Sequence, residues 1–410
     1  MQVVVIGAGA AGLVASAESA SRGTKVILLE KNTKTGVKIL MSGGTRCNLT
    51  HNTDAKGITE AFGHARRFLQ PSVGAFCPAD VVQMFNGLGV RTKVESTGKV
   101  FPVSNRAVEV RDALHRQAVE AGVDIRLRSG VDSLKQNESG SWTIKSGPNQ
   151  IDADRVIVAA GGRSWPGCGT TGDAYQWLAE IGHTITRTRP ALVPLVGGHQ
   201  WTQELSGITV PDCTASVFPT AGKQKPLIQR RASWLFTHFG FSGPAAMDVS
   251  GKMTVAESLK DVRLQLDLIP QISEAEFRET LSNRSGDGGR KKLTNIVSQW
   301  LPSRLAESLV QESGGDQSLA ELSKSSANKL IQVTKQLHLP VNGTRGFAKA
   351  EVTAGGVSLK EVDPRTMASR KATNLFIAGE VLDVDGWIGG YNFQAAFSTG
   401  RAAGIAASLP

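Results

Sequence analysis

The stretch "VVVIGAGAAG", residues 3–12, decides the fold of this chain. Four apolar residues, three of them valine, predict a short buried strand, and three glycines follow at the spacing G-x-G-x-x-G. Gly7 permits a tight turn, Gly9 lets the backbone approach a pyrophosphate, and Gly12 lets the next helix pack closely on the strand. The stretch therefore predicts the first strand, loop and helix of a Rossmann-type domain.

The residues after the glycines complete this unit. An alanine-rich segment follows Gly12, Gly23 ends it, and "KVILLE", residues 25–30, supplies a second strand. A pyrophosphate then lies at a helix N-terminus, where free N–H groups and the helix dipole favour negative charge. Glu30 ends the second strand, where a carboxylate accepts hydrogen bonds from an adenosine ribose. An acid at this place disfavours a 2′-phosphate, so FAD or NAD fits better than NADP.

A second glycine motif lacks the context of the first. Residues 167–172, "GCGTTG", repeat the spacing, but the preceding strand "RVIVAA", residues 155–160, is followed first by Gly161 and Gly162, and Pro166 intervenes. We therefore predict no second dinucleotide site. The strand is expected to return to the same parallel sheet, and the small residues at its end allow close approach to a bound cofactor.

The C-terminal stretch "NLFIAGEVLDVDGWIGGYNFQAAFSTGRAAG", residues 374–404, carries the other strong pattern. It predicts a strand over 375–378, an acidic loop that begins at Glu380 and includes Asp383, and a small-residue helix over about 392–403. The acids can bind ribityl hydroxyls or, through water, phosphate. The helix N-terminus can offset the negative charge that reduced flavin develops. This stretch therefore predicts the flavin end of an FAD site.

Length and composition indicate a soluble globular protein of two or three domains. The chain has 410 residues, 40% of them hydrophobic and 20% charged, and a chain this long exceeds a single core. No apolar run reaches the ~18 residues that a membrane-spanning helix needs. The apolar N-terminus lacks a basic region and its glycines have a fixed spacing, so we expect no signal peptide.

The cysteines argue against structural cross-links. Cys47, Cys77, Cys168 and Cys213 are scattered, with no C-x-x-C spacing. This pattern disfavours a disulfide framework or a zinc site and favours a reducing compartment. We expect a cytoplasmic protein with no metal and no stable membrane association.

The net charge leaves two interpretations open. Lys and Arg number 46 against 36 Asp and Glu, a formal charge of +10. The basic residues are spread in small groups, which is typical of a solvated surface. The excess also suits an anionic partner such as nucleic acid or a phosphorylated substrate, although the chain has no recognisable nucleic-acid motif.

Seven segments together resemble the BaiN-like and YhiN-like flavoproteins, described as NAD(P)/FAD-dependent oxidoreductases. The resemblance runs in family order over nearly the whole chain. It implies a bound FAD and three parts: a split FAD domain over 1–190 and 345–410, an inserted β-rich, barrel-like domain over 191–272 and 337–344, and a small helical domain over 273–336. The segments are "GVKILMSGGTRCNLTH" (36–51), "GKVFPVSNRA" (98–107), "AAGGRSWPGCGTTGDAY" (159–175), "IGHTITRTRPALVPL" (181–195), "LFTHFGFSGPAAMDVS" (235–250), "AEVTAGGVS" (350–358) and "AGEVLDVDGWIGGYNFQAAFSTG" (378–400).

The resemblance also assigns residues to the cofactor. The loop over 36–51 wraps the FAD in the family, but Thr45 stands where a glycine is usual and His51 where asparagine is common, so the backbone path there is open. Trp387 replaces a smaller residue near the flavin end. The fingerprint and the resemblance together predict these FAD-binding residues: Gly7, Gly9, Ala10, Ala11, Gly12, Glu30, Lys31, Lys38, Ser42, Gly43, Arg46, Cys47, Asn48, Val131, Ala160, Gly161, Gly162, Gly379, Glu380, Asp383, Gly390, Tyr391, Asn392 and Gln394.

Two residues are candidates for catalysis. His238 lies in the family segment rich in Gly and Phe, and is expected to handle a substrate or a proton. Arg46 is a candidate for an anionic substrate or the flavin, and equally for a structural partner. Its neighbour Cys47 is a reactive thiol or a small packing residue, and the missing C-x-x-C partner favours packing.

Three function classes follow from the resemblance. The first is a reductase that uses NAD(P)H to reduce a C=C bond of a small molecule through bound flavin; without a second fingerprint, the nicotinamide would bind only transiently. The second is a dihydrouridine synthase acting on ribosomal RNA, which the positive charge suits. The third is an FAD-dependent amine oxidase of the aminoacetone type.

Overall fold

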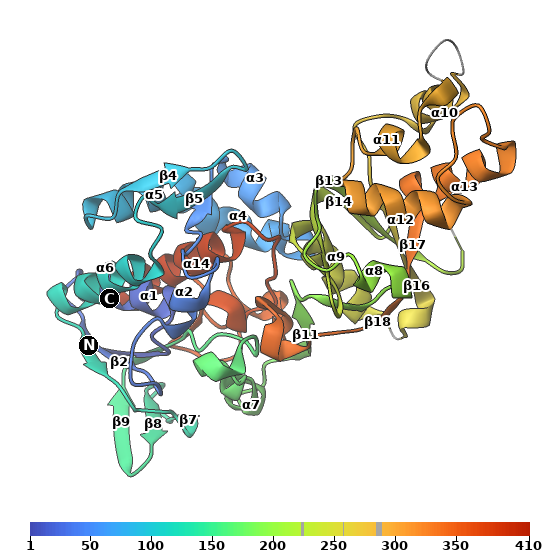
Figure 1. The fold of residues 1–410 in the computed structure, drawn as a ribbon. Helices are drawn as coiled ribbons and strands as arrows, with labels where there is room; N and C mark the ends of the chain where they lie inside the picture. The colour runs from blue at the N-terminus through green and yellow to red at the C-terminus, as the bar shows by residue number, and fades with distance from the viewer. Residues whose placement is uncertain (223–224, 257, 284–288) are drawn as a thin grey trace. The chain divides into compact units, whose positions relative to one another are not determined.

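The computed structural model describes residues 1–222, 225–256, 258–283 and 289–410. These residues form two compact units (Figure 1). Unit 1 comprises Met1–Pro190 and Ala350–Pro410, and unit 2 comprises Ala191–Lys349. The short segment 284–288, within the predicted helical domain, lies outside the described residues.

A five-stranded parallel sheet forms the centre of unit 1. Its order is β20 (Leu375–Ile377), β10 (Arg155–Val158), β1 (Gln2–Ile6), β2 (Lys25–Leu29) and β6 (Asp124–Arg126). β1 pairs with both β10 and β2, so the strand that carries the glycine loop lies in the middle. Val3 to Val5 are 0% exposed, as expected for a parallel strand that is covered on both faces. The predicted return of residues 155–158 to this sheet is confirmed.

Two helices rich in small residues pack beside this sheet. They are α1 (Ala10–Ala20) and α14 (Tyr391–Ser408), which lie side by side (Figure 1). A Cβ added at Gly400 would lie 2.4 Å from the carbonyl oxygen of Ala11, and one added at Gly404 would lie 2.5 Å from that of Ala15. Ser19 Oγ donates a hydrogen bond of 2.8 Å to Gly404 O across the same contact. The two backbones therefore approach closely only because both positions lack a side chain.

Shorter elements surround this centre. Three small sheets have the orders β3-β5-β4, β7-β8-β9 and β11-β19. The other elements of unit 1 are α2 (Val37–Met41), β3 (Thr50–His51), α3 (Ala55–Glu60), η1 (Gly63–Ala65), α4 (Arg66–Ala75), α5 (Pro78–Gly87), β4 (Thr92–Val94), β5 (Lys99–Pro102), α6 (Ala107–Glu120), β7 (Ser133–Gln136), β8 (Trp142–Ser146), β9 (Asn149–Ala153), η2 (Pro166–Cys168), α7 (Asp173–Glu180), β11 (Ile185–Ala191), β19 (Val352–Val357), η6 (Leu359–Glu361) and η7 (Gly379–Val381).

Unit 2 is built on a seven-stranded sheet of order β17-β16-β13-β14-β15-β12-β18. Its long hairpin pairs β13 (Thr209–Pro219) with β14 (Ile228–Thr237). The helices within 273–336 share one buried core with the sheet. Its other elements are β12 (Leu195–Gly197), α8 (Gln200–Gln203), β15 (Gly240–Ser242), α9 (Pro244–Val255), η3 (Leu259–Asp261), β16 (Val262–Asp267), α10 (Glu274–Ser282), α11 (Leu293–Val297), α12 (Ser303–Ser313), α13 (Lys324–Lys335), β17 (Leu337–Leu339), β18 (Val341–Thr344) and η5 (Phe347–Lys349).

Among the described residues, no helix is both long enough and apolar enough to cross a bilayer. The longest helix of unit 1 that packs on the sheet, α14, instead buries its small residues against α1.

The α1–α14 contact predicts the effect of one added methyl group. Gly400→Ala places a Cβ 2.4 Å from Ala11 O, so the two backbones must separate. We expect a loss of about 1–3 kcal/mol in the free energy of unfolding, measured in urea. Gly74→Ala is the matched control, because Gly74 is exposed in α4 and a Cβ there meets no atom within 4 Å; it should be neutral or stabilising by up to about 1 kcal/mol. Equal effects of the two substitutions would contradict the close packing.

Candidate functional site

The glycine loop leaves an open cradle before α1. Gly7 has φ +99°, and a Cβ there would lie 2.6 Å from the carbonyl oxygen of Ala159, so glycine is required. A Cβ at Gly12 would lie 1.8 Å from Gly7 O. Gly9 differs, because a Cβ there would meet no atom within 4 Å. The space in front of Gly9 is therefore open for a group outside the protein, which is the fit that a pyrophosphate requires.

The donors and the acid of the fingerprint face this cradle from two elements. Ala10 and Ala11 begin α1, so their N–H groups lack intrahelical partners and attract an anion. Glu30 follows β2 and is 8% exposed. Its carboxylate accepts from Ala8 N at 2.8 Å, and from Asn32 N at 2.9 Å and Asn32 Nδ2 at 2.8 Å. A carboxylate has about four acceptor positions, so Glu30 can still receive a ribose hydroxyl.

Two further residues near Glu30, Lys31 and Val131, were predicted to bind FAD. Lys31 Nζ pairs with Asp173 at 2.5 Å and donates to Thr171 Oγ1 at 2.7 Å. Val131 is half-buried and packs against the core of unit 1. Their roles in cofactor binding stay predictions.

The loop after α2 contains an unsatisfied buried acceptor. Asn48 is 9% exposed, and its Oδ1 has no hydrogen-bond partner among the described residues. A flavin N–H or ribityl hydroxyl would supply the missing donor. Nearby, Ser42 Oγ donates to Ile39 O at 2.7 Å, and a Cβ at Gly43 would lie 3.2 Å from Asn48 N. The loop is therefore compact around a polar group that needs a partner.

Thr45 and Cys47 show how this loop turns. Thr45 has φ 68° and Cys47 φ 59°, so both lie in the left-handed region that favours glycine. At Thr45, where the sequence left the backbone path open, a β-branched residue therefore has a strained, left-handed conformation. Cys47 is 0% exposed, and burial raises the pKa of its thiol to about 12, against a smaller lowering by Ser42. The thiol stays protonated at neutral pH, which supports packing over reactivity.

Arg46 makes several contacts with its surroundings. Its guanidinium pairs with Glu95, donates to Asn105 Oδ1 at 2.8 Å, and lies 4.0 Å from the centre of the Phe101 ring. These contacts fit the structural interpretation of Arg46. A catalytic role for Arg46 stays a prediction.

A charged cluster joins four segments that are distant in sequence. Lys38 Nζ lies 2.5 Å from Glu380 Oε2 and also contacts Ser164 Oγ. Ser164 Oγ donates to Glu380 Oε1 at 2.6 Å, and Thr353 N donates to the same oxygen at 2.9 Å. Sequence reasoning assigned Lys38 and Glu380 to the cofactor but gave no role to Ser164 or Thr353, although both lie in quoted family segments.

Small residues border this cluster. A Cβ at Gly162 would lie 2.4 Å from Thr353 Oγ1 and 2.9 Å from Glu380 Oε1. Gly161 precedes it with φ +75°, and Ala160 is half-buried against the core. The predicted small-residue end of β10 therefore lies against the acid at the end of β20.

The C-terminal loop is held by its own polar side chains. Asn392 Oδ1 accepts from Gly386 N at 2.9 Å, and its Nδ2 donates to Gly386 O at 3.1 Å. Gln394 is 0% exposed; its Oε1 accepts from Thr50 Oγ1 at 2.6 Å and its Nε2 donates to Phe76 O at 2.8 Å. Both amides thus shape the loop, and direct contact with the cofactor stays a prediction.

The glycines of the same loop allow close packing. A Cβ at Gly379 would lie 2.9 Å from Ala11 Cβ, and one at Gly390 would lie 2.4 Å from Thr50 O. Tyr391 is buried and stacks on His51, with 4.8 Å between ring centres. The loop that ends β20 therefore lies against the loop that begins α1 and against β3.

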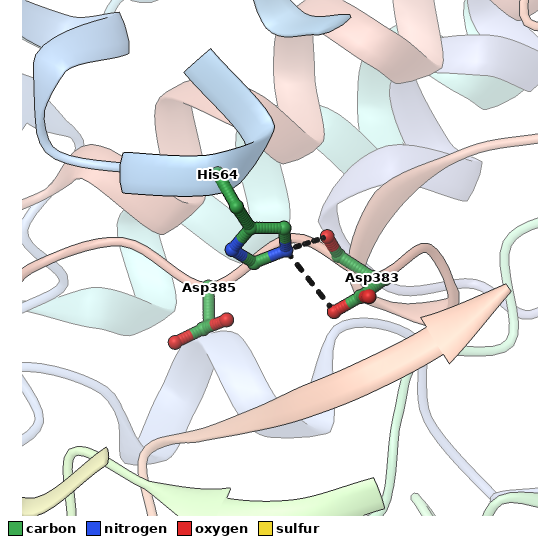
Figure 2. A group of neighbouring side chains, drawn as sticks. All are labelled: His64, Asp383 and Asp385. Carbon is green, nitrogen blue, oxygen red and sulfur yellow. Dashed lines mark hydrogen bonds and ion pairs between the residues drawn. The ribbon is translucent and has the colours of Figure 1, made fainter. Parts of the chain in front are cut away.

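Asp383 lies in a second polar group with His64 and Asp385 (Figure 2). Nitrogen Nε2 of His64 lies 3.3 Å from Asp383 Oδ1 and 3.1 Å from Asp383 O. The hydrogen bond to Asp383 raises the pKa of His64, against burial. Burial would raise the pKa of Asp383, but hydrogen bonds with His64, Thr186 and Gly355 N lower it. The three side chains are close enough to share a cation. The dashed lines in Figure 2 join His64 to the carboxylate and to the backbone oxygen of Asp383, and the contact with the carboxylate is an ion pair when His64 is protonated.

His238 belongs to unit 2. It lies between β14 and β15 and packs edge-on against Phe239, with 5.1 Å between ring centres. Its catalytic role stays a prediction.

Comparison with known proteins decides the family. The model of the HI0933-like protein Rossmann domain matches residues 1–406. The chain belongs to the HI0933-like family. The ribosomal RNA dihydrouridine synthase of Escherichia coli K12 is 32% identical, over 97% of this chain and 95% of that protein. The 3-dehydro-bile acid delta(4,6)-reductase of Clostridium scindens is 31% identical, over 99% of each chain.

A solved structure shares the fold of this HI0933-like chain. The 3-ketosteroid-delta4-(5alpha)-dehydrogenase of Rhodococcus jostii superposes with a TM-score of 0.53 and 16% identity, over 100% of this chain and 96% of that one. The predicted Rossmann-type fold and family resemblance are confirmed. As a member of this flavin oxidoreductase family, the protein is an FAD-dependent enzyme.

The cradle predicts the effect of two substitutions on cofactor content. Gly9→Val adds a side chain where the protein leaves open space, so the fold should persist while the pyrophosphate is excluded. Glu30→Ala removes the carboxylate that accepts from Ala8 N and that is predicted to receive the ribose. Both variants should purify largely without FAD, read from the flavin absorbance per chain. Gly74→Val in α4 is the control, also at a position without neighbours within 4 Å, and should keep its FAD. Full flavin content in Gly9→Val would place the pyrophosphate elsewhere.

The strain at Thr45 predicts a stabilising substitution. A left-handed conformation costs about 1–2 kcal/mol for a residue with a Cβ, and glycine loses about 0.5–1 kcal/mol of that gain through its unfolded-state freedom. Thr45→Gly should therefore stabilise the chain by about 0.5–1 kcal/mol and raise its thermal midpoint by a few degrees. Thr92→Gly in β4 should lower the midpoint instead. A lower midpoint in Thr45→Gly at unchanged FAD content would mean that the threonine side chain makes contacts worth more than the strain.

Proposed function

We propose that this FAD enzyme reduces a C=C bond conjugated to a carbonyl group, with NADH or NADPH as a transient electron donor. The open cradle at Gly9, between free helix N–H groups and Glu30, is the observation that carries the flavin part of the proposal. The reaction part is supported by the names of the relatives. A dihydrouridine synthase saturates the uracil C5=C6 bond, and a delta(4,6)-reductase saturates an enone, so both names describe the same chemistry.

Both substrates need the same two additions. A hydride must reach the carbon β to the carbonyl, and a proton must reach the α carbon. FAD supplies the hydride when it is bound in the reduced form. The protein must bind the cofactor, orient the carbonyl, exclude water and hold the proton.

Uridine in ribosomal RNA is the substrate that we favour. The relative with this activity is 32% identical over nearly the whole length of both chains. The formal charge of +10 suits a polyanionic partner. A small enone is the second candidate, supported by the similar identity of the bile acid reductase.

Anaerobic stopped-flow experiments test the proposal. NADH or NADPH should bleach the flavin of the purified protein, and an unmodified ribosomal RNA transcript should then restore the yellow colour while dihydrouridine forms. A 3-keto-4-ene steroid tests the second candidate in the same assay. Bleaching by an amine, with recovery in air and release of peroxide, would instead support the amine oxidase and contradict this proposal.

The salt dependence of binding separates the two substrates. Each phosphate that the protein neutralises releases counterions, so affinity for an RNA transcript should fall steeply between about 50 and 200 mM salt. An unchanged affinity over this range would remove ribosomal RNA as the substrate and leave the enone.

A further inference from the structure

Glu351 is a half-buried acid to which no role has yet been assigned. It directly precedes β19, whose six residues are all buried, and it is itself half-buried. Glu351 lies at a bend, two residues before Thr353. Thr353 belongs to the charged cluster of Lys38, Ser164 and Glu380, because its Oγ1 accepts from Ser164 N at 3.1 Å and its backbone N donates to Glu380. Glu351 is therefore next to this cluster along the chain, and the charges of Lys38 and Glu380 both act on it.

Glu380 and Glu351 differ in their partners. The Glu380 carboxylate receives Lys38 Nζ at 2.5 Å, Ser164 Oγ at 2.6 Å and Thr353 N at 2.9 Å. Among the described residues, Glu351 has neither a hydrogen bond nor an ion pair. It therefore has no donors of its own, whereas Glu380 has three.

The charges around Glu351 favour its protonated form. Burial raises the pKa of Glu351 and so does Glu380, while Lys38 lowers it, with a net upward shift. Lys38 and Glu380 are the charged groups that act on Glu351, and their mutual ion pair leaves Lys38 little capacity to neutralise a second acid. One lysine thus lies near two carboxylates but pairs with only one of them. Two neighbouring acids with such different environments have different pKa values, and the acid with the raised pKa can donate a proton.

Glu351 also lies at the right part of the fold. Thr353, two residues along the chain, occupies the space that a side chain at Gly162 would fill, at the small-residue end of β10. Ligands of parallel sheets bind outside the carboxyl ends of the strands, where β1, β10 and β20 bring the FAD loops together. An acid in this place is near the predicted path of the cofactor without being engaged in holding it.

We propose that Glu351 is the acid that protonates the substrate, an inference that rests on the proposed reduction of a carbonyl-conjugated C=C bond. The hydride and its two electrons go to the β carbon from reduced flavin, and the O–H bond of Glu351 breaks as a C–H bond forms at the α carbon. The Glu351 carboxylate then recovers a proton from water. The substrate is reduced by two electrons and gains two hydrogens, so the step balances without a further reagent.

Glu351→Gln tests the inference in the FAD-loaded protein, because glutamine keeps the shape and cannot give a proton. The first readout is the flavin midpoint potential, measured without substrate from about pH 5 to about pH 9. In the parent protein, the slope of this potential against pH should change where Glu351 titrates. That change should be absent in Glu351→Gln. In single turnover with the RNA transcript or the steroid enone, reoxidation of the reduced flavin should slow by about 10²–10⁴-fold. Glu120→Gln, an exposed acid at the end of α6, is the control and should leave both readouts unchanged.

The outcomes separate this inference from the proposed function. A parent-like potential profile and a parent-like turnover rate in Glu351→Gln would each overturn it. If Glu351→Gln loses FAD, Glu351→Asp, which keeps the acid, is measured instead. It should retain FAD, a slope change and partial turnover; loss of FAD in both variants would make Glu351 a structural residue and overturn the inference. If neither probe reoxidises the parent flavin, the proposed reduction fails, while the potential profile still decides whether Glu351 is coupled to the flavin.

Discussion

Close backbone approach at the ends of three parallel strands is the constraint on which the rest of unit 1 depends. A Cβ at Gly7 would lie 2.6 Å from Ala159 O, and one at Gly379 would lie 2.9 Å from Ala11 Cβ, so neither position has room for a side chain. These contacts bring α1, the loop after β10 and the loop after β20 to one edge of the sheet. FAD is an elongated cofactor, so the residues that hold it must come from several loops, and the missing side chains place those loops together.

This edge combines two kinds of polar group with different purposes. The side-chain amides of Asn392 and Gln394 are hydrogen-bonded within the protein, and they fix the shape of the loops. Asn48 Oδ1 and the space at Gly9 are unsatisfied, and they mark where a ligand completes the site. A buried acceptor without a partner costs about 1–3 kcal/mol, so FAD binding should both fill the cradle and stabilise the loop.

The fold was predictable because its signals are local. The strand over residues 3–6, the glycines after it and the acid at residue 30 are close in sequence, and the structure confirms β1, α1 and β2 there. The late strand and helix were also predicted, although α14 extends to Ser408, beyond the expected end near residue 403. Apolar small residues continue to that point, and burial against α1 outweighs the absence of a strong helix signal.

Other parts of the site depend on contacts between distant segments. No sequence pattern identifies Ser164, Thr353 or Glu351 as site residues. They come close together only in the folded chain, where the ends of β10, β19 and β20 are neighbours. Arg46 shows the opposite case: it stood out beside Cys47 in the sequence, yet its guanidinium is bonded to Glu95 and Asn105 and stacked on Phe101. His64 was not considered, because its partner Asp383 lies more than 300 residues away.

The arrangement of Lys38 between two acids explains why the chain keeps both. Glu380 pairs with Lys38 and also receives hydrogen bonds from Ser164 Oγ and Thr353 N. The second carboxylate, Glu351, is near the same lysine, but that lysine is already paired with Glu380. Burial and the charge of Glu380 raise the pKa of Glu351, so its protonated form is favoured. Removal of Lys38 would therefore affect the two acids unequally: Glu380 would lose its main partner, whereas Glu351 would lose only the weaker influence that opposes its proton. The cluster thus holds one fixed negative charge for structure and one exchangeable proton beside it, which is the division of roles that the reduction of a polarised double bond requires.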